Sequence, residues 1–333
     1  MTKSKMAFVL TPILCFSIFW MGCGNSSPSG ESKTMVEEQS ISKPNDTGTE
    51  NIQTAGFSVD FNFETKAVML NNGYEMPIIG LGTWMLDDEA AENSVYHALK
   101  DGYRLIDTAR YYGNATGIYN AVTQAIDEGI VTREEIFITT KIVPSGFSDY
   151  YATIVGCNDA LGLGYIDLML IHQQGSDEKE LYQAIEQAIE DGIVHSLGIS
   201  NYYTVEDFDR VTDGASILPA VIQNENHPFY QNTELQQYVS QYGIVVESYY
   251  SFGGRGNTQD LFNHETIMEI AAAHDKTYAQ ILLRWQLQAG YIIIPGSSNP
   301  HHIAENFNIF DFELSDDEMN RIADMNTGER YEN

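Results

Sequence analysis

The sequence predicts an α/β fold, a (β/α)8 TIM barrel with an N-terminal β-hairpin. Short runs rich in apolar and β-branched residues alternate with longer runs of helical periodicity, and this alternation is typical of a parallel sheet covered by helices. Eight such β-rich runs follow the hairpin, and eight units close a barrel. The chain has 333 residues, more than the roughly 250 that one barrel needs, and no fixed-period repeat indicates a solenoid.

The barrel is expected over residues 61–333, and it begins with the hairpin. Residues 68–70 and 76–78 are the two arms, and Asn71-Asn72-Gly73 between them is typical of a tight turn. The eight strands are expected at 78–84, 104–107, 136–141, 168–172, 196–200, 221–225, 244–249 and 292–295. Helical patterns lie between them, among others at 89–100, 178–190 and 277–288.

Residues 1–22 have the layout of a secretory signal peptide. Lys3 and Lys5 precede an uncharged run at 6–21 that is rich in Phe, Ile and Leu. This run is short for a bilayer span, which takes about 20 apolar residues. Gly22-Cys23 follows at once and resembles a bacterial lipoprotein box, in which the cysteine is lipidated.

Residues 23–60 are therefore expected to be a lipidated Cys23 and a disordered tether. They hold few apolar side chains, too few to offset the entropy of ordering. We expect a protein anchored by lipid on the extracytoplasmic face of the cell membrane, or a cytoplasmic one if the signal does not function. A plain signal peptide and an uncleaved anchor are the alternatives, because Trp20 and Met21 depart from the usual box.

Charge and cysteine content narrow the classes of partner. The chain has 47 Asp and Glu against 17 Lys and Arg, a formal charge of −30, and such a surface repels nucleic acids. Cys157 has no partner once Cys15 and Cys23 are assigned to the N-terminal signal, so no disulfide framework is expected. No Cys/His spacing indicates a metal site. We expect a monomer that acts on a small molecule.

Ionisable residues lie at the carboxyl ends of three neighbouring predicted strands. Asp107 ends the second strand, Lys141 the third and His172 the fourth, and Tyr112 follows Asp107 by five residues. The carboxyl ends of barrel strands converge on one face. The four side chains are therefore predicted to meet at one mouth of the barrel.

Several segments around these residues form a recognisable set. They are GLGTW at 80–84, GYRLIDTARYYGN at 102–114, ITTK at 138–141, LMLIH at 168–172, LGISN at 197–201, PAVIQNE at 219–225 with the following NHP, EN at 305–306 and FDF at 310–312. In order and spacing this set resembles the aldo-keto reductase family, over about residues 67–331. The resemblance implies an NAD(P)H-dependent oxidoreductase that reduces aldehydes or ketones to alcohols.

The resemblance also implies roles for the four residues at the mouth. Tyr112 would be the proton donor, and Lys141 would lower its pKa, because a nearby ammonium favours the phenolate. Asp107 would pair with Lys141 and fix its position. His172 would hydrogen-bond the carbonyl oxygen and orient the substrate, which Trp84 would also contact.

The same resemblance implies a nicotinamide cofactor site along the mouth. Ser200, Asn201 and Gln223 would bind the carboxamide, and Tyr249 would stack on the nicotinamide ring. Phe252 and Gly253 would lie along the pyrophosphate. The other implied cofactor residues are Gly82, Thr83, Asp107, Ile294, Ser297, His302, Glu305 and Asn306.

The adenosine end departs from the family pattern at two positions. Gly296 stands where many members have Lys, and His302 where they have Arg. These two cations usually bind the 2′-phosphate of NADP, and histidine lacks the fixed charge and planar fork of arginine. NADPH and NADH both remain open as cofactors, and we expect NADH to bind at least as well as NADPH.

Two other functions are compatible with parts of the sequence. An exported barrel that binds a cofactor with little or no turnover is one, because nicotinamide cofactors are scarce outside the cytoplasm. Glycan hydrolysis is the weaker one. It favours paired carboxylates at the mouth, and Asp107 is the one carboxylate assigned there.

Overall fold

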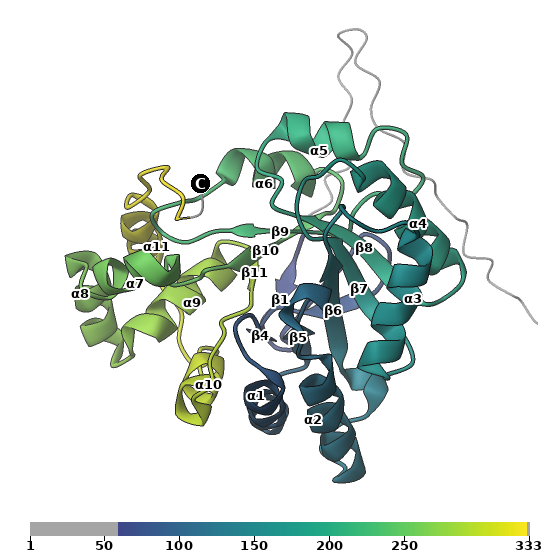
Figure 1. Ribbon diagram of the computed structural model, residues 1–333. Coiled ribbons are helices and arrows are strands. Elements are labelled where there is room, and N and C mark those ends of the chain that lie inside the picture. Colours follow the sequence, from purple (N-terminus) through teal and green to yellow (C-terminus); the bar gives the residue numbers. More distant parts are fainter. Residues whose placement is uncertain (1–58, 332–333) are drawn as a thin grey trace, which may run out of the picture. The chain divides into compact units, whose positions relative to one another are not determined.

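Eight short parallel strands form the centre of the protein in the computed structural model, which describes residues 59–331 (Figure 1). They lie side by side in chain order, and every neighbouring pair is parallel. Each overlaps one predicted strand, so the predicted barrel is confirmed. The strands are β4 Gly80–Gly82, β5 Leu105–Asp107, β6 Phe137–Ile142, β7 Ile166–Ile171, β8 Val194–Ser200, β9 Val221–Glu225, β10 Val245–Tyr249 and β11 Tyr291–Ile293.

The barrel closes where the first and last strands meet. Ile79 forms a parallel bridge with Ile293, whose N–H donates to the carbonyl oxygen of Ile78 at 3.1 Å. The two backbones come so close here that a Cβ on Gly82 would lie 2.6 Å from the carbonyl oxygen of Ile294. Glycine is therefore the residue that fits at the end of β4.

A small antiparallel sheet precedes the barrel. Its hairpin, β2 Ala67–Met69 and β3 Glu75–Pro77, is the predicted one, and Gly73 in the turn has a left-handed φ of 88°. A third strand, β1 Phe61–Asn62, pairs with β2. The sequence does not predict β1, because two residues are too short for a periodic pattern.

Helices surround the strands, as Figure 1 shows for α1 to α6. Those that follow successive strands are α1 Asp88–Asp101, α2 Ala115–Asp127, α3 Tyr150–Leu161, α4 Glu178–Glu190, α5 Val205–Val211, α6 Thr233–Ser240, α9 Tyr278–Gln288 and α10 Pro300–Phe307. Three further helices are α7 Gly254–Phe262, α8 Glu265–His274 and α11 Asp316–Ala323, and the 3-10 turns are η1 Arg110–Tyr112 and η2 Arg133–Glu135.

Helix α1 shows how local sequence sets these elements. The Asp87 side chain accepts a hydrogen bond from the N–H of Ala90 at the start, and Gly102 ends the helix with a left-handed φ of 106°. Ala91, Val95 and Ala98 are buried on one face, at the spacing of three and four residues that an amphipathic helix requires. Helix α1 packs against both α2 and α10, which completes the ring where the barrel closes.

Most buried apolar side chains belong to one core in and around the barrel, and a smaller cluster joins α7, α8, α9 and α11. Among the described residues, no helix has both the length and the apolar character needed to cross a bilayer. The predicted signal at 1–22, the lipidation site Cys23 and all but the end of the predicted tether at 23–60 lie outside the described residues.

Candidate active site

The four residues predicted to meet at the mouth do meet there. Asp107 is the last residue of β5, Lys141 lies one residue before the end of β6, and His172 directly follows β7. Tyr112 ends η1, the turn after β5. Because the strands are parallel and in chain order, their carboxyl ends bring these side chains to one end of the barrel.

Lys141 is the centre of this cluster and is 1% exposed. Its Nζ donates to Asp107 Oδ1 at 2.6 Å, to the carbonyl oxygen of Thr108 at 2.9 Å and to the Tyr112 hydroxyl at 3.3 Å. Burial is the largest effect and lowers the pKa of Lys141, but the neighbouring acidic groups, Asp107 first, together outweigh burial, so the pKa lies above its ordinary value. All three ammonium hydrogens have acceptors, and Lys141 is held charged beside Tyr112.

The pKa of Tyr112 is raised, whereas the sequence predicts that Lys141 lowers it. Burial is the largest cause of the rise, and Asp107 and Glu247 add to it. Lys141 acts in the predicted direction but is outweighed. The prediction is therefore right about the effect of Lys141 and wrong about the net shift. Tyr112 carries its proton at neutral pH and can donate it.

His172 stands beside Tyr112 with the two rings edge to face and their centroids 5.9 Å apart. Burial and the charge of Lys141 lower its pKa to about 3, so the ring is neutral at physiological pH. Its Nδ1 is buried and has no hydrogen-bond partner among the described residues. A neutral imidazole can donate one hydrogen bond to a substrate oxygen, which suits the predicted orienting role.

Backbone and side-chain hydrogen bonds hold the loop that carries Tyr112. The hydroxyl and N–H of Thr83 donate to the carbonyl oxygen of Asp107 at 2.9 and 3.0 Å. Asn114 donates to the carbonyl oxygen of Thr83 at 3.0 Å and accepts from the Thr108 hydroxyl at 2.8 Å. Thr83, which is predicted to contact the cofactor, is thus buried and links the end of β4 to the end of β5 by hydrogen bonds.

A second carboxyl group, which the sequence does not predict, lies beside this cluster. Glu247 on β10 is completely buried, and the amide nitrogen of Gln223 donates to Glu247 Oε2 at 2.6 Å and to Asp107 Oδ2 at 2.8 Å. Burial and the charge of Asp107 raise the pKa of Glu247 to about 8. The signal in the sequence is an acid within the buried strand VVESY. Gln223 therefore contacts the catalytic cluster through its amide nitrogen. Its predicted role is to bind the carboxamide of the nicotinamide.

The residues predicted at the nicotinamide form one network beyond β8. Asn201 has a left-handed φ of 65°, and its Nδ2 donates to the carbonyl oxygen of His172 at 2.8 Å and to the Ser200 hydroxyl at 3.2 Å. Its Oδ1 accepts from the Tyr249 hydroxyl at 2.6 Å and from the Tyr203 hydroxyl at 3.1 Å. These contacts hold the partly buried ring of Tyr249 at the mouth, and they add Tyr203, which the sequence does not predict.

Two glycines stand at the start of α7, which follows the carboxyl end of β10. Gly253 and Gly254 have left-handed φ values of 77° and 67°, and Phe252 before them packs on Phe262. Glycines at a helix start let an anionic group approach the backbone, so this segment fits the predicted pyrophosphate contact. The ring of Tyr331 lies over Gly254, where a Cβ would be 2.7 Å from it. The C-terminal segment is thus one wall of the site.

The predicted adenosine segment follows β11. Gly296 is exposed and Ile294 is buried, while Asn299 caps α10 by accepting from the N–H of His301 at 3.0 Å. Ser297 lies in the loop before α10, and the exposed His302 lies in the first turn of the helix. Glu305 accepts from the Thr277 hydroxyl at 2.9 Å. Ser297 and His302 therefore remain accessible, whereas Glu305 also connects α10 to the start of α9 and Asn306 is buried.

Aromatic side chains line the outer part of the mouth. Trp84, predicted to contact the substrate, is 40% exposed and meets Tyr250 edge to face at 5.8 Å. Tyr250 has a left-handed φ of 54° and packs on Tyr331 at 5.6 Å. The sequence predicts neither tyrosine as part of the site, because the end of the chain reaches it only in the folded protein.

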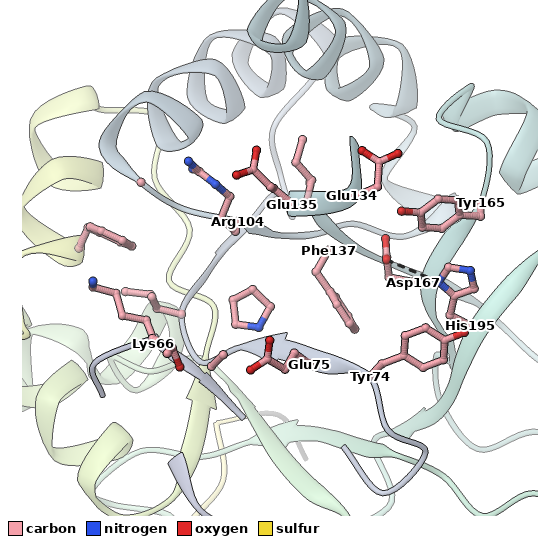
Figure 2. Close-up of a pocket in the computed structure, with 17 residues that line it drawn as sticks. Lys66, Tyr74, Glu75, Arg104, Glu134, Glu135, Phe137, Tyr165, Asp167 and His195 are labelled. Atoms are coloured by element: carbon pink, nitrogen blue, oxygen red, sulfur yellow. Dashed lines mark ion pairs between the residues drawn. The ribbon is translucent and has the colours of Figure 1, made fainter. Parts of the chain in front are cut away.

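A separate pocket of about 640 Å³ lies at the opposite, amino-terminal end of the barrel, against the hairpin. Figure 2 shows His195 between Tyr74 and Tyr165, with Asp167 beside it. Asp167 accepts from Arg133 at 2.8 Å. None of the four predicted catalytic residues lines this pocket, so it is separate from the chemistry at the mouth.

Comparison with known proteins gives consistent matches. Residues 78–327 match the aldo/keto reductase family model. The NAD(P)H-dependent D-xylose reductase I,II of Candida tropicalis is 37% identical over 304 residues, 79% of this chain and 93% of that protein. An aldo-keto reductase structure from a Medee basin deep-sea metagenome library is 38% identical with a TM-score of 0.75, covering 80% of this chain and 98% of that one. The Bombyx mori aldo-keto reductase in complex with NADP is 32% identical with a TM-score of 0.74, covering 79% and 94%.

Proposed function

The chain belongs to the aldo/keto reductase family, and we propose that Tyr112 gives the proton in its NAD(P)H-dependent reduction of carbonyl groups. The reduced nicotinamide, when bound, would supply a hydride to the carbonyl carbon and would itself be oxidised. The carbonyl oxygen then takes the proton of the Tyr112 hydroxyl, and the product is an alcohol. Aldehydes and ketones are the substrate class that this chemistry reduces.

The other residues of the cluster act on Tyr112 and on the substrate oxygen. When Tyr112 gives up its proton, the Lys141 ammonium stabilises the phenolate that forms, because the two groups already share a hydrogen bond of 3.3 Å. Asp107 holds Lys141 in place and charged. His172, which is neutral, donates a hydrogen bond to the carbonyl oxygen without competing as an acid.

One observation carries this proposal, the position of Lys141. A buried ammonium that is shared between a carboxylate and a tyrosine hydroxyl at the carboxyl end of a barrel is costly to build. Such a group is a common way to prepare an acid for proton transfer. The alternative, a barrel that binds the cofactor with little turnover, does not need this arrangement.

Tyr112→Phe tests the proposal, because it removes the acidic hydroxyl and keeps the ring. We expect the variant to lose about 10²–10⁴-fold in kcat, the usual contribution of general acid catalysis. Cofactor binding, measured by quenching of protein fluorescence, should stay near the wild-type value. The assay uses small aldehydes and includes D-xylose, the sugar in the name of a relative. A variant with near-native turnover would refute the assignment of Tyr112.

We also propose that Cys23 carries a lipid that holds the enzyme on the extracytoplasmic face of the cell membrane. The support is the uncharged run at 6–21 followed by Gly22-Cys23. Residues 24–58 separate that cysteine from the first described residue. Over about 35 residues a flexible chain spans roughly 30–35 Å on average, enough to keep the barrel clear of the lipid.

A further inference from the structure

Glu247 is a buried acid that the proposed mechanism does not use. It lies at the centre of β10, opposite Gln223 on β9 and Ile292 on β11, and it is 0% exposed. Burying an ionised carboxylate is costly unless charges or hydrogen bonds compensate it. The contacts of Glu247 therefore indicate whether its carboxyl group is protonated or ionised.

The amide of Gln223 joins Glu247 to the catalytic cluster. Its nitrogen has two hydrogens, one directed to Asp107 Oδ2 at 2.8 Å and the other to Glu247 Oε2 at 2.6 Å. The second oxygen of Glu247, Oε1, has no hydrogen-bond partner among the described residues. One amide thus bridges two carboxyl groups, one of which is already paired with Lys141.

The charges of the cluster balance only if Glu247 holds a proton. Among the residues that the structure describes, Lys141 is the one buried cation of the cluster, and its three hydrogens go to Asp107, Thr108 and Tyr112. The titratable groups that act on Glu247 are Asp107 from β5 and Lys141 from β6, and Glu247 itself acts on Tyr112 from η1. With Asp107 ionised, Lys141 charged and Glu247 neutral, the net charge is zero. Ionisation of Glu247 makes it −1 in a site of low dielectric.

We propose that Glu247 is a positioning residue that sets the alkaline limit of carbonyl reduction, acting through Gln223, Asp107 and the charge around Tyr112. The inference rests on the proposed role of Tyr112. At neutral pH the protonated Glu247 leaves Lys141 as the dominant charge beside the Tyr112 hydroxyl. At higher pH the ionised Glu247 adds a negative charge, which raises the pKa of Tyr112 and opposes the phenolate that forms during reduction. The rate of reduction therefore falls as Glu247 loses its proton.

The test compares kcat/KM for an aldehyde in the wild type and in Glu247→Gln between pH 6 and pH 9.5. Glutamine keeps the shape and cannot ionise, so the ratio of kcat/KM in the variant to kcat/KM in the wild type should rise at least about fivefold across the range, with a midpoint at the pKa of Glu247, about 8. A merely structural role would give a ratio that does not change with pH, and that result would overturn the proposal. Glu247→Asp keeps a titrating group, so it should shift the pH at which the rate falls without abolishing the fall. This variant replaces Glu247→Gln in the test if glutamine prevents folding.

Glu178→Gln is the matched control, because Glu178 is also buried but its carboxylate binds Tyr202 and Arg210 instead of Gln223. Its pH profile should follow that of the wild type. Infrared difference spectra between pH 6 and pH 9 give a readout without turnover. A protonated carboxyl band should disappear in the wild type and in Glu178→Gln, and should be missing in Glu247→Gln.

The spectra also separate this inference from the proposed function. If Tyr112→Phe remains active while the Glu247 band titrates, the role of Tyr112 is wrong and Glu247 still titrates in the site. If Tyr112→Phe is inactive and no band depends on Glu247, the proton on Glu247 is refuted while the proposed function stands.

Discussion

Gly296 lies against Gly82 at the seam where the barrel closes. A Cβ at position 296 would be 2.9 Å from the carbonyl oxygen of Gly82, and a Cβ at position 82 would be 2.6 Å from the carbonyl oxygen of Ile294. Both obstacles are backbone atoms, which cannot rotate away as a side chain can. The glycine at the position where many family members have Lys is thus tied to the closure of this barrel, besides its effect on charge.

The first prediction concerns the cofactor. Neither Gly296 nor the exposed His302 offers the fixed charge of the usual cations, and a charge-assisted hydrogen bond contributes roughly 1.5–3 kcal/mol. NADPH should therefore lose one to a few orders of magnitude in affinity, while NADH loses little. We expect NADH to bind at least as tightly as NADPH in paired fluorescence titrations at fixed salt. A preference for NADPH of more than about a hundredfold, or 2.7 kcal/mol, would contradict this prediction. It would mean that Ser297 and nearby amides bind the 2′-phosphate in place of the cations.

His302→Arg is a second check on the cofactor site. It restores the guanidinium without touching the seam, whereas lysine at position 296 would need the backbone to move. The variant should strengthen NADPH binding specifically. Equal effects on both cofactors would mean that position 302 does not face the 2′-phosphate.

The seam itself gives the second prediction. Gly296→Ala should destabilise the protein by about 1–3 kcal/mol, the usual cost of overpacking, because its Cβ meets a backbone oxygen. Gly156→Ala in α3 is the matched control, since a Cβ there meets nothing within 4 Å. It should stabilise the protein by about 0.4–1 kcal/mol. Urea unfolding measures both, and equal effects of the two substitutions would show that the seam is not tight.

The third prediction concerns Lys141. Lys141→Met leaves Asp107 buried without its cation, and breaking a buried pair costs about 3–5 kcal/mol of stability. The pKa of Tyr112 should rise further, since Lys141 lowers it, so kcat should fall by about 10²–10⁴-fold. Thermal unfolding and the pH dependence of kcat measure the two effects. Lys179→Met, whose side chain is 54% exposed, should change stability by less than about 1 kcal/mol, and Lys141 would not be the central cation if the two variants behave alike.

The fourth prediction concerns Cys23. Expressed in a bacterium that processes lipoproteins, the native chain should fractionate with membranes, and Cys23→Ser should release or mislocalise it. Cys157→Ser is the control, because Cys157 is buried in the barrel and should not affect partitioning. Recovery of the native protein from the cytoplasm with Met1 retained would refute the anchor.

Much of the fold and site can be predicted from sequence alone because it depends on local patterns. Buried parallel strands appear as short apolar runs, and Val221–Glu225 on β9 is found at its predicted bounds. Asp107, Lys141 and His172 can be grouped from their positions in the chain, since each ends a predicted strand and the carboxyl ends of parallel strands converge. The two-residue strand β1 is beyond such patterns, because it exists only by pairing with β2.

Tertiary structure alone decided what depends on burial and on contacts distant in sequence. Glu247 reaches the catalytic cluster through Gln223, which bonds to Asp107, 116 positions away in the sequence. No local sequence pattern therefore places Glu247 beside the cluster. The pKa of Tyr112 rises because burial exceeds the effect of Lys141, and burial is a property of the closed barrel. From the sequence, Gly296 is only the absence of a cation. The structure shows that it also lies where two backbone segments approach each other closely. A sequence states which charges and side chains are present, but distance and solvent exclusion set how strongly they act on one another.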